Sequence, residues 1–183
     1  KSTTLYATLN VVSRPEINVI TVEDPVEYRL PGINQVQINN KAGLTFAAAL
    51  RTILRADPDI VLVGEIRDKE TAQIALQASL TGHLVLSTLH TNDAPNAVTR
   101  LVDIGMEAYK IAPALRGVVA QRLMRRICPA CRVEMTEEIS DRLKRFIPAG
   151  ASLYSAVGCS ECSMTGYRGR FSIVEVLTMT PEL

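Results

Sequence analysis

The stretch from Leu54 to Asp68 reads LRADPDIVLVGEIRD, and it contains the clearest strand pattern of this chain. Its centre, residues 60–63, is a short run of β-branched and aliphatic residues without polar alternation. Such a run is typical of a strand in a parallel sheet that is covered on both faces. The run ends in Gly64 and Glu65, so an acidic side chain follows the buried strand directly.

Two other apolar runs share this pattern, at residues 18–22 and 84–88. Helical patterns separate the three runs. Thr45 precedes FAAALRTILRA as a capping residue, DKETAQIALQASL occupies residues 68–80 before Gly82, and a further helix runs over residues 96–105. Strands that alternate with helices predict an α/β fold with a mostly parallel sheet.

The later part of the chain changes character near Cys128. Before it, we expect a helix over residues 114–127. Residues 132–157 are polar and lack strand periodicity, although residues 137–146 are compatible with a short helix. The segment FSIVEVL, residues 171–177, alternates like a strand.

Polar residues follow each predicted strand. An acidic segment with Glu23, Asp24 and Glu27 follows the first strand, Glu65 follows the second, and His90 follows the third. In a parallel sheet these side chains lie along one edge, where open α/β folds bind ligands. An apolar strand that ends in a carboxylate also places an acid near magnesium and the attacking water in phosphoryl transfer. Each group taken alone is equally compatible with a solvated loop.

The two histidines of the chain, His83 and His90, flank the strand predicted at residues 84–88. A neutral imidazole at this edge could hydrogen-bond the terminal phosphate of a nucleotide. The alternative for either residue is a satisfied surface histidine.

The chain opens with Lys1-Ser2-Thr3-Thr4, followed by an apolar helical pattern. A phosphate-binding loop of the form GxxxxGK[ST] ends in this way, because the lysine supplies charge for the β- and γ-phosphates and the hydroxyl coordinates magnesium. The glycines of such a loop are not in the sequence. The four residues alone are also compatible with an ordinary helix start. Their interpretation as part of a phosphate-binding loop depends on the polar residues that follow the three predicted strands.

The four cysteines form two CxxC pairs, Cys128 with Cys131 and Cys159 with Cys162. In a reducing compartment such pairs bind metal more often than they form disulfides. Four thiolates are the usual ligand set of a structural zinc site. Because cysteine occupies every position, we expect a closed site without a catalytic role.

Composition argues against several classes of protein. The net charge is +1, so bulk electrostatics do not make the chain a polyanion binder. No apolar run approaches the roughly 20 residues of a membrane span, and the first residues lack a signal-peptide pattern, so we expect an intracellular protein. Arg122, Arg125 and Arg126 precede the first CxxC, but acidic residues follow soon after, and we expect no nucleic-acid partner.

Four segments together resemble the ATPases of type II secretion and type IV pilus assembly: KSTTLYA (1–7), ITVEDPVEY (20–28), LRADPDIVLVGEIRD (54–68) and TGHLVLSTLHTNDA (81–94). They look like the Walker A end, Asp box, Walker B and His box of that family, in the right order. The segment GCSECSMTGYRGR (158–170) is similar to the tetracysteine motif of its exporting and assembling members. The resemblance covers nearly the whole chain.

The resemblance implies a RecA-like P-loop core, ATP, Mg²⁺ and Zn²⁺ as ligands, and a homo-hexamer on the cytoplasmic side of the inner membrane. There such motors move pilins or pseudopilins through an inner-membrane platform protein. Position by position, it implies two groups of site residues besides the cysteines. The catalytic residues are Glu65, Glu27 and His83, and the residues that contact nucleotide or magnesium are Lys1, Ser2, Thr3, Glu23, Asp24 and His90.

The same resemblance divides the chain into three parts: a RecA-like core truncated within the P-loop at residues 1–127, a zinc-binding subdomain at 128–170, and the start of a truncated segment at 171–183. A chain that begins at Lys1 is expected to bind ATP weakly and to hydrolyse almost none, because backbone N–H groups of the glycine-rich loop supply most of the phosphate cradle. Two other functions stay open at this point. They are a RecA-like nucleic-acid translocase and a zinc adaptor without enzymatic activity.

Overall fold

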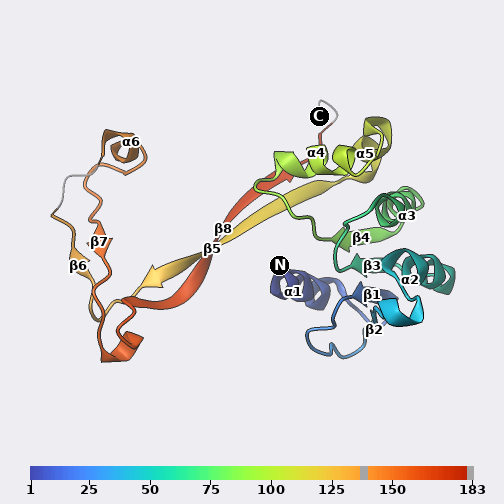
Figure 1. Ribbon diagram of the computed structural model, residues 1–183, viewed down its shortest axis with the longest axis horizontal. Coiled ribbons are helices and arrows are strands. Elements are labelled where there is room, and N and C mark those ends of the chain that lie inside the picture. The colour runs from blue at the N-terminus through green and yellow to red at the C-terminus, as the bar shows by residue number, and fades with distance from the viewer. Residues whose placement is uncertain (137–139, 181–183) are drawn as a thin grey trace. The chain divides into compact units, whose positions relative to one another are not determined.

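A computed structural model describes residues 1–136 and 140–180. The first part of the chain forms a four-stranded parallel sheet (Figure 1). The strand order is β2-β1-β3-β4. The strands are β1 (Val19–Glu23), β2 (Asn34–Gln37), β3 (Ile60–Val63) and β4 (Leu84–Ser87). All three pairings are parallel, and Val63 lies between Val22 of β1 and Ser87 of β4. The carboxyl ends of the strands therefore meet at one edge.

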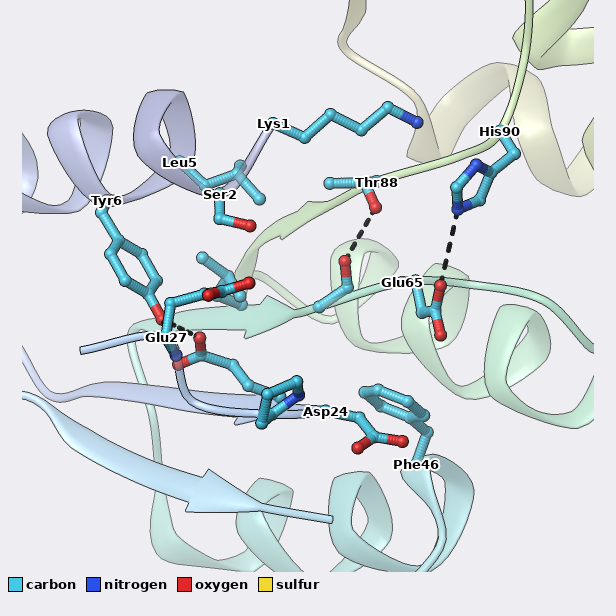
Figure 2. Close-up of a pocket in the computed structure, with 14 residues that line it drawn as sticks. Lys1, Ser2, Leu5, Tyr6, Asp24, Glu27, Phe46, Glu65, Thr88 and His90 are labelled. Atoms are coloured by element: carbon cyan, nitrogen blue, oxygen red, sulfur yellow. Dashed lines mark hydrogen bonds and ion pairs between the residues drawn. The ribbon is translucent and has the colours of Figure 1, made fainter. Parts of the chain in front are cut away.

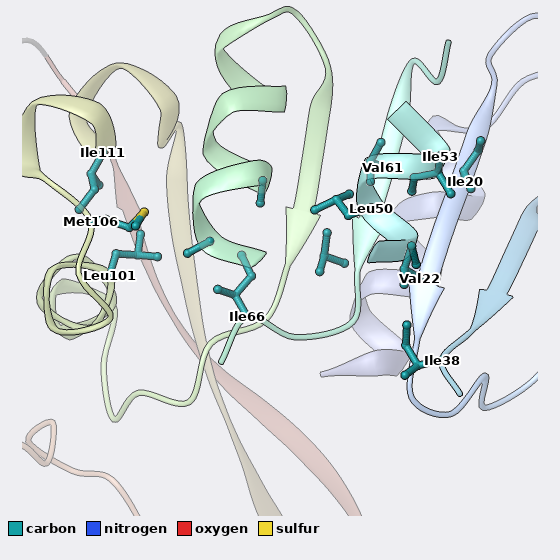
Figure 3. Packing of buried hydrophobic residues seen from close by; sticks show 14 residues of the cluster. Ile20, Val22, Ile38, Leu50, Ile53, Val61, Ile66, Leu101, Met106 and Ile111 are labelled. Carbon is teal, nitrogen blue, oxygen red and sulfur yellow. The ribbon is translucent and has the colours of Figure 1, made fainter. Parts of the chain in front are cut away.

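Alternate residues of β3 pack into two separate hydrophobic clusters, one on each face of the sheet. Ile60 and Leu62 contact the first cluster, which contains Tyr6 and Leu9 of helix α1 (Ser2–Val12). The second cluster contains Val61 and Val63 (Figure 3). On this face the strand residues pack against buried side chains of four helices: α2 (Phe46–Ile53), α3 (Lys69–Leu80), α4 (Pro95–Asp103) and α5 (Ala108–Ala114). Every residue of β1 and β3 is buried, as the unbroken apolar runs predict. The run at residues 84–88 has the same pattern, but burial is not confirmed there: β4 is partly exposed, because it lies at an edge of the sheet and β3 is its neighbour on one side.

The predicted helix starts are confirmed at two positions. The Thr45 hydroxyl accepts a hydrogen bond from the backbone N–H of Ala48 at 3.2 Å, and it caps α2. The Asp68 carboxylate accepts from the N–H of Thr71 at 2.8 Å and caps α3. Gly82, with φ +105°, follows the end of α3 and allows the chain to turn into β4.

The helix predicted over residues 114–127 is wrong. Helix α5 ends at Ala114, and the chain then forms the strand β5 (Gly117–Ile127), which pairs with β8 (Tyr167–Thr178). β8 confirms and extends the strand predicted at residues 171–177. Local periodicity favoured a helix, but hydrogen bonds to a strand more than forty residues away stabilise the extended form, and no local pattern shows that pairing.

The remaining described elements are short. They are β6 (Val133–Glu134), which pairs antiparallel with β7 (Tyr154–Ser155), helix α6 (Asp141–Lys144), and the 3₁₀ turns η1 (Asn40–Ala42), η2 (Leu54–Ala56) and η3 (Ser160–Cys162). The short helix suggested at 137–146 lies partly outside the described residues, and α6 is its described part. No helix in the described ranges has the length and apolar character needed to cross a membrane.

The chain forms two compact units. The first contains Lys1–Ala120 and the chain from Glu175 onward, and the second contains Gln121–Val174. The first unit holds the parallel sheet, and the second holds the two CxxC pairs.

Candidate functional site

The first unit has a cavity of about 200 Å³ at the carboxyl edge of the sheet (Figure 2). Its walls come from the first turns of α1, from the acidic segment after β1, and from the residues after β3 and β4. The sequence predicted that polar residues at three strand ends would share one edge, and the parallel register produces this arrangement. The lining residues that carry charge or a histidine ring are Lys1, Glu23, Asp24, Glu27, Glu65 and His90.

The amino end of α1 forms one wall of the cavity. Lys1 and Ser2 line it, and the Lys1 ammonium donates a hydrogen bond to the backbone carbonyl of Leu89 at 2.5 Å. Thr3 is exposed and is not part of the lining. A helix amino end presents unsatisfied backbone N–H groups and partial positive charge, which suits a phosphate group. The lysine adds a full positive charge, which its side chain carries from α1 toward the chain after β4 (Figure 2).

Glu65 occupies the opposite wall, directly after β3. Its side chain is 16% exposed, and its Oε2 atom lies 2.7 Å from Nε of Arg67 and 3.6 Å from Nε2 of His90. Figure 2 shows His90 reaching over this carboxylate from the chain after β4. An acid that is mostly shielded from water yet directed at the cavity can accept a proton from a bound water.

Thr88 and Gly64 fix the turn that carries Glu65. The Thr88 hydroxyl donates to the Gly64 carbonyl at 2.8 Å, and the Gly64 N–H donates to the Val22 carbonyl at 2.8 Å. A Cβ atom on Gly64 would lie 3.2 Å from the Val22 oxygen and 3.4 Å from Cα of Glu23. Both neighbours are backbone atoms of β1, so they have little freedom to move away.

This crowding makes Gly64→Ala a test of the strand-end packing. We expect the added methyl group to destabilise the fold by about 1–2 kcal/mol, the usual cost of overpacking a closely packed site. Chemical denaturation with a probe of the sheet measures the change. An unfolding midpoint equal to that of the unsubstituted protein would show that β1 and β3 separate without cost at this end.

The three acids of the segment after β1 differ in their surroundings. Glu23 is buried, with 4% of its surface exposed, whereas Asp24 and Glu27 are exposed at the cavity. The Glu23 carboxylate accepts a short hydrogen bond from the Tyr6 hydroxyl, which itself accepts from the Glu27 N–H at 3.3 Å. Burial and the hydrogen bond to Glu23 raise the pKa of Tyr6 to about 12, so the phenol stays protonated and remains a donor.

His83 lies away from this cavity. It precedes β4, whereas His90 follows it, so the four residues of the strand, about 13 Å of extended chain, separate the two rings. The His83 Nδ1 atom lies 2.9 Å from the Ala78 carbonyl at the end of α3. The structure therefore does not bring His83 together with the other predicted site residues within this chain, because a parallel strand places its two ends at opposite edges.

Sequence reasoning did not assign several lining residues to the site, among them Tyr6, Phe46 and Thr88. One signal was available for Tyr6, which follows Ser2 by four positions and so lies on the same face of α1. Phe46 opens α2 and reaches the cavity across the sheet edge, and nothing in the local sequence indicates that contact.

The second unit gathers the four cysteines. Their Sγ atoms all lie within 4.8 Å of one another, and the Cys131–Cys162 and Cys159–Cys162 sulfur pairs are each 3.8 Å apart. None of the four forms a disulfide. Ligands at the usual Zn–S distance of about 2.3 Å in a tetrahedron are separated by about 3.8 Å. The spacing of the sulfur atoms therefore fits a tetrahedral metal ion.

Backbone N–H groups point at this cluster. The N–H groups of Cys159 and Gly166 donate to the Cys162 sulfur, each at 3.2 Å, and the Gly158 N–H donates to the Cys131 sulfur at 3.3 Å. Burial raises the pKa of the Cys162 thiol, but the hydrogen bonds from Cys159 and Gly166 outweigh it and lower the pKa to about 6. These donors favour the thiolate at Cys162, the form that binds metal, whereas burial outweighs the Gly158 hydrogen bond at Cys131 and raises the pKa of that thiol to about 11.

This chain is similar in sequence and in fold to proteins of bacterial secretion and pilus systems. A "Putative type II secretion system protein E" of Escherichia coli K12 is 54% identical over 185 residues, which cover 100% of this chain and 38% of the relative. "Type IV pilus assembly ATPase PilB" of Thermus thermophilus is 52% identical over 188 residues, with 100% of this chain and 21% of the relative covered. This chain thus spans well under half the length of either relative.

Among solved structures, the pilus retraction motor PilT with bound ADP matches with a TM-score of 0.68 and 30% identity, covering 98% of this chain and 44% of that one. The Legionella pneumophila ATPase DotB matches with a TM-score of 0.64 and 25% identity, covering 100% and 43%. The sequence profile of the family described as "Type II/IV secretion system protein" matches residues 1–183, which is the whole chain. The chain belongs to the type II/IV secretion system protein family.

Proposed function

We propose that this chain is the nucleotide-hydrolysing part of an ATP-driven motor for type II secretion or type IV pilus assembly. One observation carries the proposal. A single cavity at the carboxyl edge of the sheet combines the positively charged start of α1 with the Glu65 carboxylate on the facing wall. The positive charge can bind the phosphate groups of a nucleotide, and the carboxylate can activate the attacking water.

The residues around the cavity divide between binding and proton transfer. Lys1 and Ser2 hold the phosphates, and the Ser2 hydroxyl with Asp24 or Glu27 would hold Mg²⁺. When bound, Mg²⁺ neutralises charge on the phosphate oxygens. Hydroxyl and carboxylate oxygens are the donors that this ion prefers, so the residues present fit it.

Glu65 is the proposed general base. Its carboxylate orients the water that attacks the terminal phosphorus and takes its proton. Arg67 and His90 both contact Oε2 of Glu65, so they hold the carboxylate in place before substrate arrives. His90 can also donate to a phosphate oxygen from the same position. The predicted contacts of Thr3 and His83 with nucleotide or reacting groups remain predictions, since neither residue lines the cavity.

We also propose a division of the chain into three parts and an assembly into a ring. We assign a RecA-like nucleotide core to residues 1–127, a metal-binding subdomain to 128–170 and a further segment to 171–183. The two compact units support a division into a sheet-containing part and a cysteine-containing part. The similarity to secretion and pilus ATPases supports a homo-hexamer that works with a membrane platform protein at the cytoplasmic face of the inner membrane.

The relatives do not separate secretion from pilus assembly, because proteins of both kinds match at 54% and 52% identity. They do argue against a nucleic-acid translocase. The test is Mg²⁺-dependent ATP hydrolysis by the full-length protein, with and without DNA. Hydrolysis that EDTA abolishes and DNA leaves unchanged is the expected result, whereas stimulation by DNA would favour the translocase.

Zinc is the proposed metal of the cysteine cluster. The four-sulfur donor set, the 3.8 Å sulfur separations and the N–H groups directed at two of the sulfurs support a closed structural site. We expect metal analysis of the full-length protein purified under reducing conditions to give about one zinc ion per chain. Two disulfides and no metal under the same conditions would contradict the assignment.

A further inference from the structure

Glu23 differs from the other acids at the cavity because its carboxylate is already engaged on both oxygens. Its Oε1 atom accepts from the Thr21 hydroxyl at 2.5 Å and from the Gln35 side-chain amide at 3.2 Å. Its Oε2 atom accepts from the Tyr6 hydroxyl. Thr21 and Tyr6 are also buried, with 0% and 1% exposed. A magnesium ion or a nucleotide would have to displace buried donors to reach this carboxylate.

Tyr6 links three parts of the cavity wall. It lies on the same face of α1 as Ser2, its hydroxyl donates to Glu23 at the end of β1, and the same oxygen accepts from the Glu27 N–H. Its ring packs edge-on against Tyr28, with 4.6 Å between ring centroids. One phenol thus connects the helix that opens at Lys1 to the backbone of the acidic segment.

Two glutamines of β2 hold the rest of that segment. The Gln35 side chain accepts from the Leu30 N–H at 2.7 Å and donates to the Tyr28 carbonyl at 3.2 Å, in addition to its bond with Glu23. The Gln37 side chain accepts from the Val26 N–H at 3.3 Å. Side chains of α1, β1 and β2 therefore hold the segment in place, while Asp24 and Glu27 stay exposed at the cavity (Figure 2).

We propose that Tyr6 and Glu23 form a positioning pair that fixes the acidic segment, and that Asp24 and Glu27, but not Glu23, supply the carboxylates that meet magnesium and nucleotide. This inference rests on the proposed function for its catalytic part. It changes the role of Glu23 from a ligand to a residue that acts through Tyr6 and Gln35. The sequence pattern alone does not separate Glu23 from Asp24 and Glu27 in this way.

The first experiment needs no nucleotide. Tyr6→Phe removes one oxygen atom and leaves the ring and its packing. We expect amide hydrogen exchange of a peptide covering residues 24–30 to accelerate about tenfold, because the Glu27 N–H loses its acceptor and the link to Glu23 is broken. Tyr28→Phe is the matched control and should leave exchange unchanged, since the structure gives its hydroxyl no described partner. Equal exchange in all three proteins would overturn the positioning role of Tyr6, whether or not the protein hydrolyses ATP.

The second experiment separates positioning from direct coordination in the full-length protein. Glu23→Gln removes the charge, but its amide oxygen can still accept from Thr21 and Gln35, and its NH₂ group can donate to the Tyr6 oxygen. We expect kcat within about threefold of the parent and an unchanged Mg²⁺ concentration for half-maximal hydrolysis, whereas Glu23→Ala and Tyr6→Phe lower kcat about tenfold or more. Glu27→Gln should raise the Mg²⁺ requirement.

A different pattern would reverse the assignment. If Glu23→Gln raises the Mg²⁺ requirement as much as Glu27→Gln, and is as inactive as Glu23→Ala, then Glu23 acts through its charge as a ligand. Failure of the unsubstituted protein to hydrolyse ATP would instead count against the proposed function, and the exchange measurement would still decide the role of the pair.

Discussion

Glu65→Gln in the full-length protein should lower the rate of ATP hydrolysis by about 10²–10⁴-fold while nucleotide binding persists. The substitution keeps the shape of the side chain and removes its ability to take a proton. Glu65 is the acid that directly follows the central strand β3, and its carboxylate lies at the cavity between Arg67 and His90. A loss of kcat without a loss of affinity is the signature of an interaction made only in the transition state.

The measurement pairs steady-state hydrolysis with titration of Mg²⁺ and a non-hydrolysable nucleotide. Glu70→Gln is a suitable control, because Glu70 is an exposed acid on α3 that forms an ion pair with Arg51 at 2.6 Å, outside the cavity lining. It should leave both kcat and affinity near those of the parent. Near-normal turnover of Glu65→Gln would show that another acid activates the water, and Glu27 would be the next candidate.

The second large effect is expected for Cys128→Ser. We expect loss of zinc and local unfolding of the second unit, with the parallel sheet preserved. The reason is that the described residues of this unit form no hydrophobic core. Among the described residues of 121–174, only Cys128, Cys162 and Gly166 are buried. Structural zinc in small metal-dependent domains contributes about 10–16 kcal/mol in apparent binding free energy, which is more than this unit's few buried contacts supply.

Metal analysis and limited proteolysis test this expectation. Cleavage between Cys128 and Gly166 should become fast, while a probe of the first unit, such as its resistance to denaturant, changes little. Ser160→Ala is the control, because Ser160 lies in the same turn as the cysteines but is exposed. A full zinc content in Cys128→Ser, with normal resistance to protease, would show that the fourth ligand is dispensable.

Local pattern was sufficient where an apolar run or a capping residue marks the element. The strands β1, β3 and β4 and the helices α2 and α3 lie where the sequence predicted them. By contrast, β2 went unnoticed, because its sequence NQVQ is polar and half-exposed at the edge of the sheet and has no apolar run. β5 was mistaken for a helix for a related reason, since its stability depends on pairing with the distant β8.

The sequence by itself determined which residue types end the strands, and hence that Asp24, Glu27, Glu65 and His90 gather at one edge, because parallel strands carry their carboxyl ends to the same side. It also determined that four thiols are available as a ligand set. Two features depended on the tertiary structure: the burial of Glu23 under Tyr6, and the pairing of β5 with the distant strand β8. Strand direction and helix packing are set by contacts between residues distant in the chain, and those contacts decide whether a polar side chain meets a ligand or another side chain.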